Sequence, residues 1–464
     1  MATKSVSDLA AAVWQHLRRK QIASPSVSTL KEFFELIYLA SLKTEEGRPL
    51  QLRIALVDPN NRDPDRPPAP RASRWQFIEM ENRLPLTVPN LVKLAKAADP
   101  WSSCLAAYFN PNSEFFIWGL VDQTVHFNTL LVREREGGYA QPGLFNVLTA
   151  GPADLTVYRE WGFVARLAQD RLLGRQNNVF WSGPVADRLS EGIEHYIKEV
   201  RKPFPRDERD EIDVGYLAEQ WISTLCRILI SIQRYGHGGA LLITTSNSHL
   251  DIKYPVEYSR LPRALVNLGV WRQRAMRARW EIRGKRRTKY KNGVPWGWYF
   301  EEHVSESQRE DVQDEITGSV RFISSLSCVD GLILASPDLS IRGFGVEIRP
   351  KKEVKTLYMA SSPAPKSKSL NRIDPYHYGT RHRSMMRYCM AHPRSAGFVI
   401  SQDGEIRAIT RMRKRLVMWE NLQVQSLHEE VPRRKLTLQE FRMLQGMLGE
   451  KSSDPSLWIP PKDA

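Results

Sequence analysis

The sequence contains few cysteines and lacks any long apolar run. Its four cysteines, Cys104, Cys226, Cys328 and Cys389, are widely separated and form no Cys-X-X-Cys pair. This spacing argues against a zinc cage or a disulfide framework and favours a reducing cytoplasm. No window approaches the roughly 18 uninterrupted apolar residues of a membrane helix, and the N-terminus lacks the apolar core of a signal peptide. We therefore expect a cytoplasmic protein with no membrane partner.

Acidic residues are the scarcer of the two charge types. The chain of 464 residues has 67 Lys and Arg against 52 Asp and Glu, which gives a formal net charge of +15. A positive potential of this size favours polyanionic partners, both nucleotides and nucleic acids, although a solvated basic surface gives the same balance. The length exceeds what one hydrophobic core usually organises, so two or three domains are expected.

A break in the apolar pattern divides the chain. Residues 201–214 combine prolines with a dense run of charges, which predicts a domain boundary. Before it, a helical pattern at residues 30–42 and a strand-like run at 52–57 predict an α+β N-terminal domain over residues 1–205. After it, residues 216–236 place leucine, isoleucine and tryptophan at intervals of three or four, which predicts an amphipathic helix that stops near Gly236.

Helices and strands alternate through the second region. The predicted strands cover residues 237–244, 328–336, 341–349 and a hairpin at 395–409, and the predicted helices cover 314–327 and 383–392. The alternation predicts an α/β domain over residues 213–418, with a central mixed sheet flanked by helices, followed by a helical tail over 419–464. Two stretches interrupt it, a basic insertion at 271–300 and a loop at 360–372.

A cationic motif stands directly before the last of these helices. It consists of Gly379, Thr380, Arg381, His382, Arg383 and Ser384. Backbone amides at a helix start, a hydroxyl and two guanidinium groups suit phosphate oxygens. Surface arginines ahead of a helix would give the same pattern, so the motif alone leaves both interpretations open.

A carboxylate and a glycine begin a short hydrophobic strand. Burying the charge of Asp330 there costs free energy unless the carboxylate caps a turn, binds a metal or meets a cation. Gly331 allows a ligand to come close to the backbone. A carboxylate near an arginine pair is what metal-assisted nucleotidyl transfer needs. An Asp-Gly pair on its own is also typical of a plain turn.

An ordered series of segments resembles the diadenylate cyclase domain family. The series consists of GGALLI at residues 238–243, VDGLIL at 329–334, GFGVEI at 343–348, GTRHRS at 379–384 and VISQDGEI at 399–406. The resemblance covers roughly residues 213–418. Stretches at 38–50, 86–100 and 115–123 are similar to a sensor module fused ahead of some bacterial cyclases of this family.

The resemblance implies an activity and its residues. It implies condensation of two ATP molecules into cyclic di-AMP, a bacterial second messenger, with release of two pyrophosphates. The metal would be Mg or Mn, and the active form would be a face-to-face homodimer or a higher homo-oligomer. Asp330 would be the catalytic metal ligand, with Gly331 and Leu332 beside it. The catalytic and phosphate-binding residues would be Gly379, Thr380, Arg381, His382, Arg383, Ser384 and Ser401.

Two departures from the family pattern bear on this reading. Leu332 replaces the usual alanine, a bulkier side chain that could reshape the nucleotide slot, and Gln402 with Asp403 replaces an acidic pair. A signalling module that binds a nucleotide or cyclic dinucleotide without turnover is the alternative.

The basic insertion suggests a further alternative. Between residues 271 and 291 its cations interleave with Trp271, Trp280 and Tyr290, and Glu281 is its only acid. This pattern is typical of a nucleic-acid groove, and equally of a solvated helix or of a surface for an acidic partner. A nucleic-acid-binding protein on a cyclase-like scaffold therefore also fits.

Overall fold

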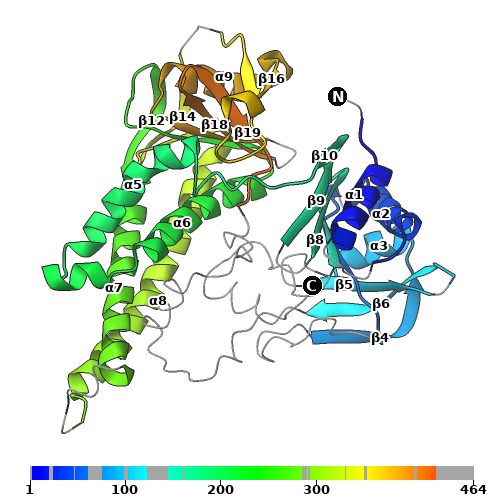
Figure 1. The fold of residues 1–464 in the computed structure, drawn as a ribbon, viewed down its shortest axis with the longest axis horizontal. Helices are drawn as coiled ribbons and strands as arrows, with labels where there is room; N and C mark the ends of the chain where they lie inside the picture. The colour runs from blue at the N-terminus through cyan, green and yellow to red at the C-terminus, as the bar shows by residue number, and fades with distance from the viewer. Residues whose placement is uncertain are drawn as a thin grey trace.

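The chain folds around two mixed β-sheets, each with its own helices, in a computed structural model (Figure 1). The structure describes residues 3–19, 24–45, 47–60, 76–98, 103–110, 112–122, 145–159, 162–284, 290, 293–329, 331–349, 353–401 and 405–424. The α+β N-terminal domain and the mixed-sheet second domain that the sequence predicts are both present. No helix in these ranges is long and apolar enough to cross a membrane.

The first sheet has eight strands. In sheet order they are β10 (Arg171–Leu173), β9 (Gly162–Ala168), β8 (Asp154–Arg159), β7 (Phe145–Gly151), β3 (Leu52–Leu56), β5 (Ser103–Phe109), β6 (Phe115–Asp122) and β4 (Gln76–Pro85). Three helices accompany it: α1 (Val6–Arg19), α2 (Val27–Ser41) and α3 (Val88–Ala95). A two-stranded ribbon, β1 (Thr44–Glu45) with β2 (Arg48–Pro49), follows α2.

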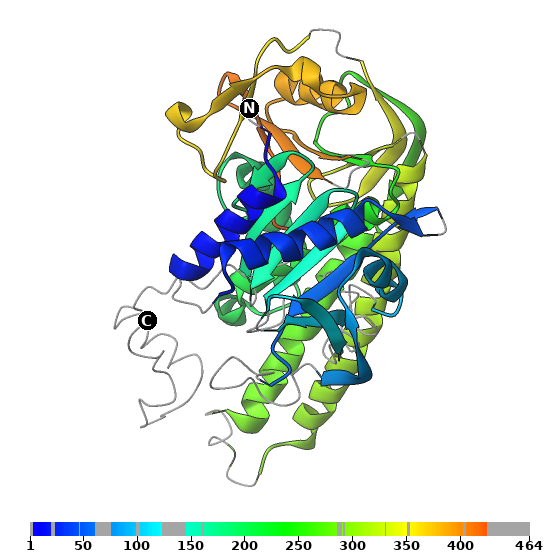
Figure 2. The ribbon, with the colours of Figure 1, turned by 90° about the vertical axis from the view of Figure 1, so that its right-hand side faces the viewer.

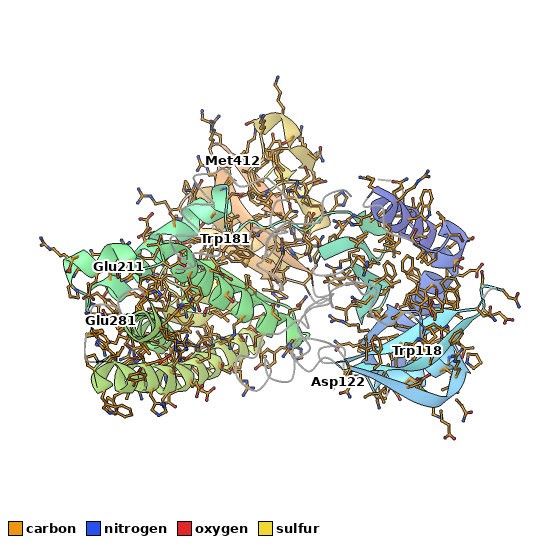
Figure 3. All side chains as sticks on the ribbon, turned by 60° about the horizontal axis from the view of Figure 1, so that its bottom comes forward. Trp118, Asp122, Trp181, Glu211, Glu281 and Met412 are labelled. Carbon is orange, nitrogen blue, oxygen red and sulfur yellow. The ribbon has the colours of Figure 1, made fainter. Side chains whose placement is uncertain are left out.

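The first domain buries an apolar cluster on each face of its sheet. Figure 2 shows α1 and α2 lying across one face, where Phe33 and Phe34 of α2 are fully buried. The helix begins cleanly because the Ser26 hydroxyl accepts a hydrogen bond from the Thr29 amide at 3.1 Å. On the other face Trp118, labelled in Figure 3, is buried and donates its indole N–H to the Val57 carbonyl at 3.0 Å.

The second sheet has nine strands. In sheet order they are β12 (Leu250–Tyr258), β14 (Ile341–Ile348), β13 (Leu332–Ala335), β11 (Gly239–Ile243), β17 (Ala396–Ile400), β18 (Ile406–Met412), β19 (Arg415–Trp419), β15 (Leu357–Met359) and β16 (Asn371–Ile373). Its helices are α5 (Pro184–Arg201), α6 (Val214–Arg234), α7 (Arg260–Arg283), α8 (Trp296–Ser325) and α9 (Thr380–Ala391). Short 3₁₀ turns occur in the connections of this domain, at η2 (Arg206–Glu211), η4 (Leu326–Cys328), η5 (Ser367–Ser369) and η6 (Pro375–His377).

Helices cover both faces of the second sheet because its central strands are apolar on both sides. Leu241 and Ile333 share a buried cluster with α5, α6 and α8, whereas Leu242 and Leu334 share one with α9. The predicted helix after residue 214 is confirmed as α6, with its apolar stripe buried. Gly236 follows it with φ +69°, the left-handed conformation that favours glycine at a helix end.

The boundary between the two domains differs from the expected one. Residues up to 205 were assigned to the N-terminal domain, but Val185, Leu189 and Val200 of α5 are buried in the cluster of the second domain. The proline and charge run at 201–214 forms η2, a surface turn between two helices of one core. The tail predicted over 419–464 lies outside the described residues from 425 onward.

The basic insertion is helical. Its first part continues α7 and its end begins α8, so the two helices form a long hairpin that extends away from the sheet (Figure 1). Glu281, labelled in Figure 3, is buried on α7 and accepts a hydrogen bond from the Tyr290 hydroxyl at 2.8 Å. The same Tyr290 oxygen accepts from the Trp298 indole at 2.9 Å, which ties the ends of the two helices together.

Candidate functional site

One edge of the second sheet gathers the residues that the sequence singles out. Strands β11 and β13 are parallel with Ala240 opposite Leu332, so both begin at this edge. Strand β17 runs antiparallel to β11 with Ile400 opposite Gly239, so Ser401 follows β17 at the same edge. Gly331 and Ser401, which the sequence places far apart, therefore share one edge.

Gly331 lies against the cationic motif. Its φ is +80°, and a Cβ at this position would lie 2.8 Å from Nη2 of Arg381. The positive φ favours glycine, and a side chain added here would require the Arg381 guanidinium to shift. The structure thus places Gly331 beside the Arg-His-Arg segment, and the joint action of the two motifs stays a prediction. Asp330 itself lies outside the described residues.

The N-terminus of α9 carries the cationic motif. Gly379 is the N-cap and has no side chain to satisfy the first amides, while Thr380 and Arg381 are exposed. Arg383 is half-buried, and its Nε has no hydrogen-bond partner among the described residues. Ser384 instead accepts a hydrogen bond from Arg387 at 3.2 Å. The helix start therefore offers amides, a hydroxyl and two guanidinium groups to an anion.

His382 points into the protein. It is buried, and its ring centroid lies 5.4 Å from that of Tyr378. Its Nε2 lies 3.1 Å from Nη1 of Arg407. This geometry fits a side chain that orients the motif, whereas Arg381 and Arg383 on either side are the more accessible cations.

Arg407 and Glu405 are site residues that sequence reasoning missed. Both are buried and form an ion pair at the start of β18. Arg407 also donates to the Ser401 hydroxyl at 2.6 Å, and that hydroxyl donates to the Glu405 carbonyl at 3.3 Å. The argument applied to Asp330, a charge beside a short apolar strand, would have identified Arg407 as well.

Burial dominates the electrostatics of this group. It raises the pKa of Glu405, and the neighbouring Arg407 opposes that rise only in part, while the charge of Glu420 adds to it. Burial also raises the pKa of Tyr378, against which the Arg407 guanidinium packs at 5.6 Å from the ring centroid.

Leu332 belongs to the interior. It is the first residue of β13 and lies in the apolar cluster that includes Met385 and Met386 of α9. Its side chain therefore helps to hold α9 on the sheet. Gln402 and Asp403, the other departure from the family pattern, lie outside the described residues.

The expected metal has no cluster of its own in the described part of the chain. Among those residues, no three His, Cys, Asp or Glu side chains gather in a way that could hold an ion. A magnesium ion bound chiefly by substrate phosphates needs only one or two carboxylates, so Asp330 alone would meet that requirement.

Several of the described cations of the basic insertion have partners within the protein. Arg279 pairs with Glu302 at 3.0 Å and with Glu306 at 2.6 Å, and Arg277 pairs with Glu208 at 2.8 Å. Arg272 packs 3.0 Å from the centroid of the Tyr216 ring. These acids come from η2 and α8, outside the segment whose composition suggested a nucleic-acid groove. Residues 285–289 and 291 lie outside the described residues.

Comparison with known proteins identifies part of the first domain. Residues 19–122 match the family model described as "Probable sensor domain DACNV", a sensor module found in diadenylate cyclases. The match includes strands β3 to β6 of the first sheet. No curated protein matches the chain. The chain therefore contains a segment similar to a sensor domain, which suggests a sensor-regulated signalling protein.

Proposed function

We propose that the protein is a sensor-regulated diadenylate cyclase that condenses two ATP into cyclic di-AMP and two pyrophosphates. The observation that supports this most is the contact between Gly331 and the Arg381 guanidinium. It places the residue next to Asp330 directly beside the start of α9, where a phosphate chain would bind. The sensor domain ahead of it supports a regulated enzyme.

Each residue has a distinct task in this proposal. The α9 amides, Thr380, Arg381 and Arg383 hold the phosphates of one ATP, and Asp330 would hold a Mg or Mn ion, which would neutralise phosphate charge. The 3′-hydroxyl of the facing ATP attacks the α-phosphate, a new P–O bond forms, and the bond to pyrophosphate breaks. The hydroxyl proton is released, and the second half repeats the step in reverse orientation. Alignment supplies much of the rate, so two facing chains are required.

The test is direct. Purified protein is incubated with ATP and Mg or Mn, and products are identified by mass spectrometry, with Asp330→Asn as the matched variant. We expect cyclic di-AMP from the wild type and none from the variant, because one charge is removed with little change in volume. Full turnover by Asp330→Asn would contradict the metal assignment.

A second candidate is a nucleotide-binding signalling module without turnover. It is favoured by one observation: the Ser401 hydroxyl is already engaged by Arg407 and by the Glu405 carbonyl. If ATP binds in a calorimeter but no cyclic product forms with either metal, this candidate replaces the first. Absence of both binding and product contradicts both candidates.

A further inference from the structure

A group of buried charges lies between the sensor domain and the candidate site. The Arg407–Glu405 pair is fully enclosed, with about 7% and 5% of each residue exposed. A buried ion pair contributes little net stability, because desolvation offsets the attraction. Nor does the proposed reaction require it. A role beyond packing would explain why these charges are placed here.

Arg407 contacts two residues of the site at once. Its Nη1 donates to Ser401 Oγ at 2.6 Å and lies 3.1 Å from His382 Nε2. A guanidinium group can only donate, so Nε2 must accept and the ring proton of a neutral His382 must reside on Nδ1. Arg407 therefore fixes both the tautomer of His382 and the direction of the Ser401 hydroxyl.

The first sheet contacts the same group of charges through its last strand. Arg171 on β10, the edge strand of the first sheet, forms an ion pair with Glu420, which directly follows β19. Because Ala408 pairs with Trp419, Glu420 lies across from Arg407 at the site edge. The connecting segment, residues 174–183 between β10 and α5, is held there too, since the Asn177 side-chain amide donates to the Glu420 carbonyl at 2.8 Å.

The first sheet also bears on the pKa of Glu405. Burial raises that pKa, Arg407 opposes the rise, Glu420 adds to it, and Arg166 and Arg171 of the first sheet oppose it further. Arg166 is itself held by Asp154 on β8, at 2.8 Å from its Nε. Glu405 and Arg407 are buried, so water screens their charges weakly and moving one of them changes the preferred position of the other.

We propose that Arg407 is a positioning residue for His382 and Ser401, and that the first domain, which contains the sensor match, acts on the site by setting the position of Arg407 through Arg171, Glu420 and Glu405. The identity of the regulated reaction rests on the proposed function. A signal that displaces β10 would loosen the Arg171–Glu420 pair. Glu405 and Arg407 would then move, and the start of α9 would lose its fixed histidine.

The first test observes the histidine itself and needs no catalysis. The ring nitrogens of His382 are followed by NMR in the full-length chain labelled at histidine, with the signal assigned from a His382→Gln spectrum. We expect the Nδ1–H tautomer in the wild type, and both Arg407→Met and Arg171→Gln should move the signal. Arg175→Gln is the matched control, because Arg175 is exposed in the same segment and also loses one charge. An identical His382 signal in Arg171→Gln and wild type overturns the inference.

The second test separates positioning from folding. Arg407→Lys keeps the charge but loses the planar fork, so kcat should fall about 10- to 100-fold, the range for one charge-assisted hydrogen bond, while the KM for ATP changes less. Arg171→Gln should lower kcat when made alone but should lower it little further in the Arg407→Lys background. If the two losses in kcat add fully, Arg171 does not act through Arg407. Absence of cyclic product from wild type instead contradicts the proposed function, and the NMR result still decides the inference.

Discussion

The two sheets are similar in construction but differ at their edges. Both are mixed, and both bury apolar clusters on each face. In the first sheet, the charged residues described above, Arg166 and Asp154, pair with one another across neighbouring strands. In the second, one edge collects a glycine with positive φ, a bare helix start and arginines that no described carboxylate neutralises at Arg381 and Arg383. The charged pair in the first sheet is thus neutralised within the sheet, whereas the arginines at the candidate site of the second sheet are open to a ligand.

The largest expected effect separates the two cores. Trp221 of α6 and Trp118 of β6 are both fully buried, in different clusters. Each Trp→Ala change should lower the free energy of unfolding of its own domain by about 3–5 kcal/mol, because a large cavity is left. Hydrogen exchange read by mass spectrometry reports each domain separately.

The control for the core variants is a tryptophan on the surface. Trp296 at the start of α8 is 77% exposed, so Trp296→Ala should change stability by less than about 0.5 kcal/mol. If either buried variant destabilised both domains equally, the two sheets would form one cooperative unit.

The next effect compares the two ends of α9. Arg381→Ala and Arg383→Ala should each weaken ATP binding about 10- to 100-fold, since each removes a charge-assisted contact with phosphate. Arg394→Ala is matched, because it is exposed just beyond the other end of the helix. Calorimetric titration measures the dissociation constants. Equal losses in all three variants would show that net charge, not the helix start, attracts the nucleotide.

A glycine pair tests the role of close approach. Gly331→Ala and Gly236→Ala both place a side chain at positive φ, which should cost about 1–2 kcal/mol of stability. Only at Gly331 does the added Cβ meet Arg381; at Gly236 nothing lies within 4 Å. Denaturant unfolding should therefore give similar losses, whereas ATP titration should give a loss for Gly331→Ala alone. Unchanged binding in that variant would sink the packing argument.

The smallest effect concerns thiol reactivity. Burial raises the pKa of Cys104 in the first sheet and of Cys389 in α9 to about 12, and it raises that of Cys226 as well. Cys328 is exposed just before the Asp330 segment. A thiol reagent should modify one cysteine per native chain, none in Cys328→Ser, and saturating ATP should slow the reaction. Rapid modification of Cys104 would mean that the first sheet opens readily.

Local patterns were enough to predict much of the second domain. Helix α6, strands β11, β13 and β14, and the β17–β18 hairpin follow from apolar periodicity and turn residues, which act over a few positions. Gly331 also lies beside Arg381, whose motif the sequence groups with it, while the joint action of the two motifs stays a prediction. The place of α5 in the second domain could not be predicted, because the charged turn after this helix resembles a linker in sequence.

The missed features depend on neighbours distant in the chain. Nothing near Arg279 indicates that Glu302 and Glu306 will face it from a second helix, so the segment looked like an unpaired cationic surface. The same holds for Arg407, because its role depends on His382 and Ser401, which approach it only in the folded sheet. Charge composition alone therefore overstates what a basic segment offers to a partner.

The pairing between the connecting segment and the end of the second sheet has a topological consequence. The Asn177 amide donates to the Asn421 carbonyl at 2.9 Å, and Asn177 forms a bridge with Leu422. The chain thus enters and leaves the second domain at one point. A unit with adjoining ends can be grafted into a surface loop of a host protein without stretching that loop. We expect residues 177–422 to fold when they are inserted into such a loop. Movements of the host protein at the insertion point would then act on the candidate site in place of the first domain.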